Sequence, residues 1–535
     1  MSANLPDLRQ PKLTVALIAR DAEELLPATI ESIRFVADEI LVVDTGSLDR
    51  TCAIAADANA KILNVPWNDD FSAPRNLALA QATGDWILWL DAGETVTAEV
   101  AQAIKLFIRE QADPARAYLM VVEVPPEGKT ISSEQVGRIR LLPNFKGLRY
   151  EGRVRERLNN SLAGANVLIE MLPWKIQRSA REHDPLVKSG KARRDLRLAE
   201  LEMQEHGRSA AMLNVLGDAY SRLGDTVAAI DSFRRGLEVS QRGSVDMLEA
   251  YYGLLAVFDA DASQQPEQFR TCLAALEIYP LDAQLLCAMG SYLQMQGRID
   301  LALRAYQAAA ENGQVDPQTW HLGDINDVAT VCRCLCLQLL NQDDTARQVL
   351  VQALAREGSA PRLRRQLIEL YVKHDLRQEA LEQINLMPAE TVQREPLRTA
   401  VRGACLAAKQ NWAAAVGYLR AAHAGGCRDP LCLRWLAVSL IALGEFQEAE
   451  PILAEWHEEE PKHPDVAKYV EIIAQRRSGT GPTPPPSLPP LPASLPASSA
   501  DLQYRIDPSR HGAPAPPNAP TAGKPASGRS PFLRT

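Results

Sequence analysis

The chain has 535 residues, of which 46% are hydrophobic, and a formal net charge of −9 at neutral pH. This length predicts two or more structured units, because a single hydrophobic core rarely organises so many residues. The acidic balance gives no basic face for phosphates and so argues against a nucleic-acid partner. The opening stretch "MSANLPDLRQPKLT" lacks the apolar segment of a secretory signal, and no apolar run approaches the ~20 residues that cross a bilayer. We therefore expect a cytoplasmic protein without a transmembrane segment.

Residues 11–185 alternate short apolar runs with longer amphipathic ones. The runs at 14–19, 39–44, 60–66 and 85–91 are typical of buried strands, and those at 22–37, 48–58 and 72–82 of helices. Further strands are expected at 117–125 and 137–143. This alternation predicts an α/β domain with a parallel sheet, whose ligands bind beyond the carboxyl ends of the strands. Asp44 ends the second strand and Asp91 the fourth, so both are expected at that edge.

Residues 190–475 form an alanine- and leucine-rich region with an internal repeat. In six places an alanine follows a small or apolar residue at an offset of twelve, which permits close packing of a helical hairpin. These pairs are Gly217–Ala229, Gly290–Ala302, Cys334–Ala346, Ile368–Ala380, Gly403–Ala415 and Ala437–Ala449. Later units begin 34 or 35 residues apart and resemble the tetratricopeptide repeat, TPR, whose concave surface can hold a protein partner. Wider spacings predict a degenerate unit around residues 248–280 and an insertion at about 312–325.

Residues 478–535 are dominated by Pro, Ser, Ala and Gly. Such a segment cannot bury enough apolar surface to order itself, so a disordered tail is expected.

Several polar residues at the expected strand ends suit a nucleotide ligand. In "EILVVDTGSLDRT", Asp44 can accept hydrogen bonds from a base or ribose, and Ser47 lies in a small-residue turn that lets a ligand approach. The alternative is that Asp44 only caps this turn. Arg75 could pair with a diphosphate, and Asp91 could hold a divalent cation. The alternative for these two is an exposed helix charge and a strand-end acid.

These stretches resemble a known enzyme family. Residues 12–157, with "VVDTGSLDRT", "WNDDFSAPRNLALAQATGDWILWLDAGE" and "YEGRVRERL", resemble the family 2 glycosyltransferases of GT-A fold, in the subgroup of sublancin-type S-glycosyltransferases and lipopolysaccharide-core transferases. TPR units often follow the domain in that subgroup. The resemblance implies that Asp44 binds the nucleotide, that Arg75 lies near the donor and that Asp91 opens the DxD metal motif.

The chain also departs from the family pattern. Gly93 stands where the motif has its second acid, and Arg155 stands where the family commonly has His. Glu94 or His183 could restore a site for Mn²⁺ or Mg²⁺, or Arg155 could neutralise the diphosphate directly. In the other interpretation the pocket has lost catalysis.

Glu156 and Glu151 are the candidates for the base that takes the acceptor's proton, although either could instead pair with a neighbouring arginine. The sequence thus predicts transfer of a sugar from a nucleotide-sugar donor to an acceptor that the TPR array recruits. That acceptor could be a protein, a glycan or a lipid-linked sugar. The alternative is a degenerate transferase domain on a TPR interaction scaffold. Chemistry requires Asp44, Arg75, Asp91 and Arg155 to converge on one open cleft.

Overall fold

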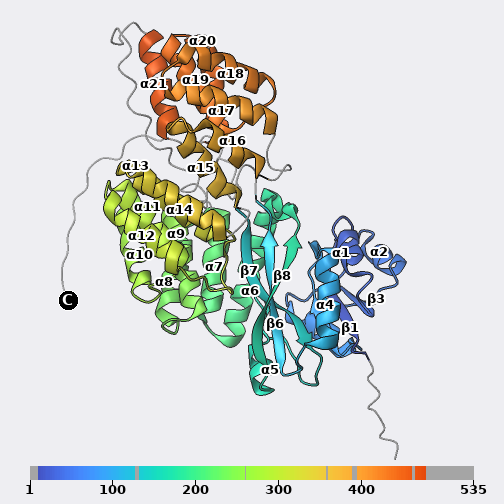
Figure 1. Ribbon diagram of the computed structural model, residues 1–535. Helices are drawn as coiled ribbons and strands as arrows, with labels where there is room; N and C mark the ends of the chain where they lie inside the picture. The colour runs from blue at the N-terminus through green and yellow to red at the C-terminus, as the bar shows by residue number, and fades with distance from the viewer. Residues whose placement is uncertain are drawn as a thin grey trace, which may run out of the picture.

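The structure is a computed structural model that describes residues 10–126, 132–259, 261–356, 360–387, 394–460 and 464–477. It contains a mixed α/β sheet domain followed by a long helical array (Figure 1). This architecture confirms the predicted fold class. The tail expected at 478–535 lies outside the described residues.

One nine-stranded sheet forms the first unit. Eight strands follow the order β3-β2-β1-β4-β7-β6-β8-β5, and β9 pairs with β7. The strands are β1 (Leu13–Ala19), β2 (Glu39–Asp44), β3 (Lys61–Asn64), β4 (Trp86–Trp89), β5 (Glu94–Thr95), β6 (Arg116–Val124), β7 (Glu134–Pro143), β8 (Leu168–Arg178) and β9 (His321–Leu322). Strands β1 to β4 pair in parallel, whereas β4–β7, β6–β7, β5–β8 and β7–β9 are antiparallel.

The parallel half of the sheet is buried on both faces, which explains its nearly continuous apolar strands. Successive residues of β1 point to opposite sides, so Val15 belongs to the core shared with α1 and α4, and Ala16 to the core shared with α3. The covering helices are α1 (Leu26–Ile33), α2 (Thr51–Asp57), α3 (Ser72–Gln81) and α4 (Ala98–Glu110), and a short helix α5 (Asn159–Gly164) precedes β8.

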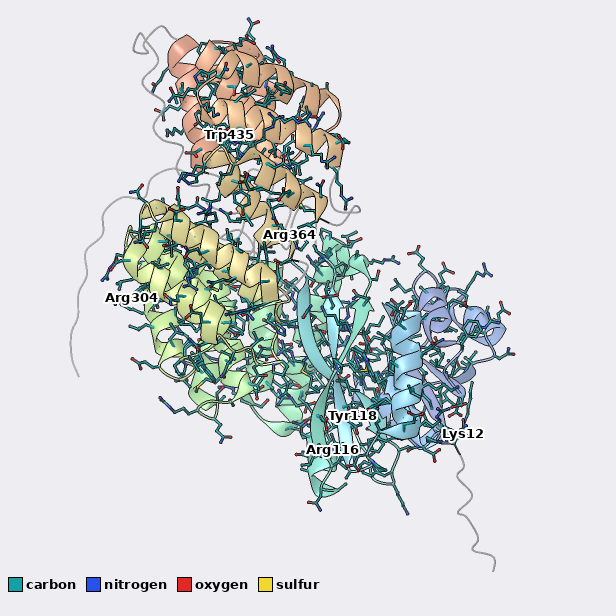
Figure 2. All side chains as sticks on the ribbon, in the orientation of Figure 1. Lys12, Arg116, Tyr118, Arg304, Arg364 and Trp435 are labelled. Atoms are coloured by element: carbon teal, nitrogen blue, oxygen red, sulfur yellow. The ribbon has the colours of Figure 1, made fainter. Side chains whose placement is uncertain are left out.

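A long connecting helix, α6 (Pro185–His206), begins at the N-cap Asp184 and leads into paired helices. The pairs are α7 (Ala210–Leu223) with α8 (Thr226–Val239), α9 (Val245–Asp259) with α10 (Gln265–Leu276), α11 (Ala283–Met295) with α12 (Ile299–Asn312), α13 (Ile325–Leu339) with α14 (Asp343–Arg356), α15 (Pro361–Lys373) with α16 (Arg377–Asn385), α17 (Arg394–Ala408) with α18 (Trp412–Ala424), and α19 (Pro430–Leu443) with α20 (Phe446–Glu459), and α21 (Pro464–Arg477) follows. Each alanine at the predicted offset of twelve is fully buried on the second helix of its pair. Figure 2 shows Trp435 in the upper part of the array and Arg364 near the sheet.

The insertion expected between two repeats joins the sheet. Its strand β9 pairs with the start of β7, with Leu322 opposite Glu134. Beside it the backbone N–H of Gly137 donates to the carbonyl of Pro317, and a Cβ at Gly137 would lie 2.9 Å from that oxygen. Only glycine lets the two backbones approach so closely. The helical array is therefore continuous with the sheet by backbone hydrogen bonds.

Candidate functional site

A cavity of about 1020 Å³ lies between the carboxyl ends of the parallel strands and the first helices of the array. The residues that follow β1, β2 and β4 form one wall, and α6, α7, α9 and α11 form the opposite wall. This is the edge at which open α/β sheets bind ligands. The sequence-based placement of the site at the strand ends agrees with this position.

Charged residues line this cavity, and cations outnumber anions although the chain as a whole is acidic. The ten Arg and Lys residues are Arg20, Arg75, Arg138, Arg155, Arg178, Arg181, Lys188, Lys191, Arg194 and Arg222. The seven Asp and Glu residues are Asp21, Asp91, Glu134, Glu156, Asp195, Asp218 and Glu249. The site therefore favours an anionic ligand.

Arg75 links two of the predicted catalytic residues. Its guanidinium donates to Glu156 through Nε and to Asp91 Oδ1 through Nη2, the latter at 3.3 Å. It also lies over the rings of Trp89 and Tyr150, at 4.5 and 5.3 Å from their centroids. These aromatic faces favour a cation and hold the side chain in one orientation. Arg75, Asp91 and Glu156 thus form a fixed group at the cavity wall.

The turn after β4 explains why glycine occupies position 93. Gly93 has φ +96°, a conformation that side-chain-bearing residues adopt at a cost, and its N–H donates to Thr29 Oγ1 at 2.9 Å. The turn closes through Glu94 N–H donating to the carbonyl of Asp91, also at 2.9 Å. As a result Glu94 points back into the protein and is 1% exposed.

Two arginines that the sequence analysis did not single out hold these acids. Arg140 donates to Glu94 Oε1 at 2.6 Å and to Asp91 Oδ2 at 3.1 Å. Arg178 donates to the same two oxygens at 2.8 and 3.3 Å. Glu94 Oε2 accepts from the backbone N–H of Asp91 at 3.0 Å. Burial alone would raise the pKa of the Asp91 carboxyl, but Arg140, Arg75 and Arg178 together hold it well below its usual range.

This arrangement does not fit a divalent cation. Metal ligands need carboxylate oxygens free to face the ion, whereas both oxygens of Glu94 and both of Asp91 already accept hydrogen bonds. No group of three or more His, Cys, Asp or Glu side chains among the described residues is arranged to hold a metal ion. His183, the other residue considered for this role, lies in the cavity wall and contacts the carbonyl of Pro125 at 2.8 Å.

Asp44 and Ser47 close their own turn. Asp44 is 5% exposed and accepts hydrogen bonds from the backbone N–H groups of Gly46 and Ser47, at 3.0 and 3.1 Å, and from the Ser47 hydroxyl. The Ser47 hydroxyl in turn accepts from the backbone N–H of Asp21 at 2.9 Å. Neither Asp44 nor Ser47 lines the cavity, although the adjacent Thr45 does. Of the four residues expected to converge on the cleft, Arg75, Asp91 and Arg155 reach it.

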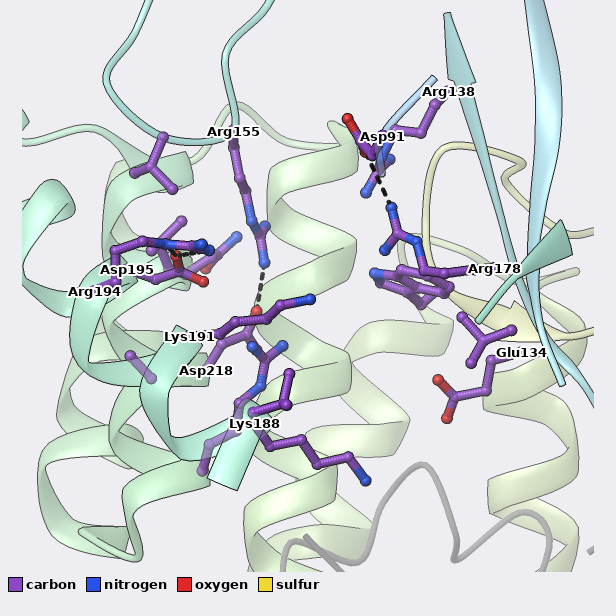
Figure 3. A pocket seen from close by; sticks show the side chains of 18 of the residues that line it. Asp91, Glu134, Arg138, Arg155, Arg178, Lys188, Lys191, Arg194, Asp195 and Asp218 are labelled. Atoms are coloured by element: carbon purple, nitrogen blue, oxygen red, sulfur yellow. Dashed lines mark hydrogen bonds and ion pairs between the residues drawn. The ribbon is translucent and has the colours of Figure 1, made fainter. Parts of the chain in front are cut away.

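Arg155 contacts the helical array rather than the strand ends. Its guanidinium pairs with Asp218 of α7 (Figure 3). It also pairs with Glu249 of α9 at 2.6 Å. Burial would lower the pKa of Arg155, but Glu249 and Asp218 raise it above its usual range. Arg155 is therefore an ion-pair contact between the two units as well as part of the cavity wall.

Its neighbours in the "GRVRERL" stretch make similar contacts. Arg153 pairs with Glu205 of α6 at 2.6 Å, and Arg157 pairs with Asp246 of α9 at 2.7 Å. The alternating arginines of this loop thus all bind carboxylates of the array. Glu151, at the start of the loop, is exposed, accepts from Asn160 at 2.6 Å and does not line the cavity. The structure therefore brings Glu156, but not Glu151, to the site.

Arg138 is the other important residue that the sequence analysis missed. Its Nη1 donates to the carbonyls of Gly137 and Gln318, at 3.3 and 3.1 Å, and it has no carboxylate partner among the described residues. Burial is the main cause that lowers the pKa of Arg138 to about 10. The charge of Glu249 opposes this shift, whereas the charges of Arg155, Arg140 and Arg178 add to it. The signal in the sequence was the alternation of Arg138 and Arg140 in an otherwise apolar strand, which places both on one face.

Comparisons with known proteins agree with this two-part organisation. Residues 14–135 match the family model described as glycosyl transferase family 2. A TPR repeat-containing protein of Synechococcus elongatus is 34% identical over 251 residues, covering 45% of this chain and 60% of its own length. An uncharacterized glycosyltransferase of Rickettsia bellii is 30% identical over 115 residues, covering 21% of this chain and 39% of its own length. A tetratricopeptide repeat protein of Parabacteroides merdae matches with a TM-score of 0.38 and 14% identity, covering 50% of this chain and 98% of its own.

The chain thus spans less than two thirds of each of these two relatives by sequence. Every helix in the described part of the chain is too short or too polar to cross a membrane. Residues 14–135 thus match the glycosyl transferase family 2 model, and a TPR-like helical array follows them.

Proposed function

We propose that this protein transfers a sugar from a nucleotide-sugar donor to an acceptor that the helical array recruits. The observation that carries the proposal is the shared cavity, in which the strand ends with Asp91 face helices α6, α7 and α9. A donor at the strand ends and an acceptor entering along the helices would meet inside this space. The excess of cations on its walls suits the diphosphate of such a donor.

Glu156 is the proposed general base. It lines the cavity and is positioned by Arg75, which also holds Asp91. In a single displacement, the acceptor hydroxyl attacks the anomeric carbon, the bond from that carbon to the diphosphate oxygen breaks, and the hydroxyl proton passes to Glu156. The nucleoside diphosphate leaves with the bonding electron pair. Arginine side chains near Asp91 would stabilise the charge that develops on it.

The acceptor is proposed to be a protein, a glycan or a lipid-linked sugar held by the array. Stacked helical pairs create an extended concave surface, and such surfaces hold extended peptides and other proteins. Two aromatic side chains line the cavity on the side of the array: Tyr252 of α9 and Trp320 of the insertion. Aromatic faces of this kind suit both peptide side chains and sugar rings.

The test is calorimetric titration of the full chain with a panel of nucleoside diphosphate sugars, followed by measurement of sugar transfer. Asp91→Asn is expected to change donor binding, because Arg75, Arg140 and Arg178 lose the carboxylate that holds them in place. Glu156→Gln is expected to bind donor and to lose transfer, because general-base catalysis contributes typically 10²–10⁴-fold. Glu151→Gln, a matched change outside the cavity, is expected to retain both. Equal transfer by Glu156→Gln and wild type would refute the assignment of the base.

The second candidate is a non-catalytic scaffold with a degenerate transferase domain. It is supported by the ion pairs that occupy Asp91 and Glu94 and by the engagement of Arg155 with Asp218. This alternative predicts that the chain binds no donor, or binds one without turnover, while the array retains its partner. Absence of binding across the panel would favour it over the enzyme.

A further inference from the structure

We propose that the cavity binds the donor's diphosphate through Arg138 and Arg178 directly, without a divalent cation. This inference rests on the proposed donor binding and specifies its chemistry. It assigns the anion site to two arginines of β7 and β8, and not to Arg155.

The carboxylates of the site are already occupied by arginines. A cation bound to Asp91 or Glu94 would need to lie about 2.0–2.6 Å from their oxygens. Those oxygens already accept hydrogen bonds from Arg75, Arg140 and Arg178 at 2.6–3.3 Å. An added dication would displace these groups or sit against their positive charge. Position 93 offers no further oxygen, because the turn there requires glycine.

The charge around Asp91 is not that of a metal site. Arg75, Arg140 and Arg178 pair with the three carboxylates Asp91, Glu94 and Glu156, and the charge of Glu249 acts on Arg138. This group is neutral and the whole cavity carries a positive excess before any ligand binds, whereas a pair of metal-binding acids would carry a negative one. A diphosphate is the complement of such a cavity, since arginine binds phosphate oxygens in a bidentate manner.

Only some of these arginines face the cavity. Arg140 is 4% exposed and is buried behind the two acids, whereas Arg138 and Arg178 line the cavity. The hydrogen bonds of Arg138 go to the backbone carbonyls of Gly137 and Gln318, and the charge of Glu249 acts on it without a hydrogen bond between them, so its guanidinium can still donate to a phosphate. Figure 3 shows Lys188 and Lys191 extending from α6 into the same space, on the wall opposite Asp91. Their charges add to the attraction for an anion.

Arg155 is less suited to this role. Its guanidinium is turned toward Asp218 of α7 and Glu249 of α9, on the helical wall of the cavity, whereas Arg178 lies on the strand wall and pairs with Asp91. Arg155 was one of the alternatives drawn from the sequence, beside a cation held by Glu94 or His183, and the geometry favours the strands β7 and β8 instead.

The experiment is calorimetric titration of the full chain with inorganic pyrophosphate and with the nucleoside diphosphate sugars, each in EDTA and in Mn²⁺. Pyrophosphate is expected to bind equally in both buffers. Arg138→Gln is expected to weaken that binding about tenfold or more, because it removes a charge-assisted hydrogen bond from a buried site. Arg138→Lys should recover part of it. Arg116→Gln, on β6 outside the cavity, is the control and should bind as wild type does. Circular dichroism and the thermal midpoint verify that each variant is folded.

Each outcome bears on the proposal separately from the proposed function. Binding that requires Mn²⁺, or equal binding by Arg138→Gln and wild type, overturns the arginine site while leaving donor binding intact. Pyrophosphate binding that depends on Arg138, combined with no binding of any nucleotide sugar, supports the anion site and rejects the glycosyltransferase proposal. No binding of either probe overturns both.

Discussion

The close packing of α7 against α8 depends on Gly217, and replacing it by alanine tests the repeat geometry. A Cβ at Gly217 would lie 2.6 Å from Cε1 of Phe233, the large side chain of α8. The ring cannot move away, because Gly253 of α9 contacts it closely as well: a Cβ there would lie 2.3 Å from Phe233 Cζ. The ring is thus held between two glycines.

Two opposing effects set the size of the change. Alanine favours a helix interior by about 1 kcal/mol over glycine, whereas an extra methyl in a well-packed core costs typically about 1–3 kcal/mol. Gly217→Ala should therefore lose up to about 2 kcal/mol of stability. Gly417→Ala is the matched control, since Gly417 lies in α18 and an added Cβ there meets nothing within 4 Å. That variant should gain up to about 1 kcal/mol.

Urea denaturation of the full chain, followed by far-ultraviolet circular dichroism, measures both variants. Midpoints are compared directly, because a chain with several units need not unfold in two states. Phe233→Leu in the Gly217→Ala background should recover part of the loss by removing the ring. The reasoning is refuted if Gly217→Ala raises the midpoint as much as Gly417→Ala does.

Three further predictions concern the site and its surroundings. Arg155→Met should destabilise the chain by about 1–3 kcal/mol in urea denaturation, because it leaves the Asp218 carboxylate without this arginine partner. Adding Asp218→Asn should restore part of the lost stability. An unchanged urea midpoint would show that the contact contributes nothing. Gly93→Ala should lower the thermal midpoint, since φ +96° costs alanine about 1–2 kcal/mol, and an unshifted midpoint contradicts this backbone. Burial raises the pKa of Asp282 from 3.8 to about 6, so its contribution to stability is present below pH 3.8 and is lost as pH rises through about 6. The thermal midpoint of the wild type, measured relative to that of Asp282→Asn, should therefore fall as the pH rises from 3.8 to about 6. Parallel pH profiles of the two proteins would contradict the assignment.

Much of the architecture could be predicted because its signals are local. The strands of the parallel half read as apolar runs, and the offset of twelve residues located every described hairpin of the array except α9–α10, which was expected only as a degenerate unit. Helix α4 was missed although Ala101, Ile104 and Ile108 repeat with helical spacing and are buried, so its signal was present in the sequence. Strand β8 was missed for a physical reason: most of its residues are exposed or half-exposed, and its partners β5 and β6 are set by tertiary pairing.

The site was predicted less completely than the fold. Arg75, Asp91 and Glu156 were identified from their stretches, and all three line the cavity. The partners of Arg155 lie 63 and 94 residues away on the array, and no local pattern indicates such a pair. Arg178 was overlooked because its strand was not predicted. Ion pairs between the sheet domain and the helical array are set by the tertiary fold. The family resemblance does not include these pairs, and it therefore placed Arg155 near the donor.

The pairing of β9 with β7 has a consequence for how the chain folds during synthesis. The β7 edge near Glu134 gains its partner Leu322 only after most of the first half of the array has been made. At about 5–20 residues per second, the ribosome takes roughly ten seconds or more to reach that point. During this interval the edge is open to pairing with another nascent chain, as unpaired strand edges are. A ribosome-associated chaperone, or early packing of α6 and α7 against the sheet, would have to protect it until the insertion arrives.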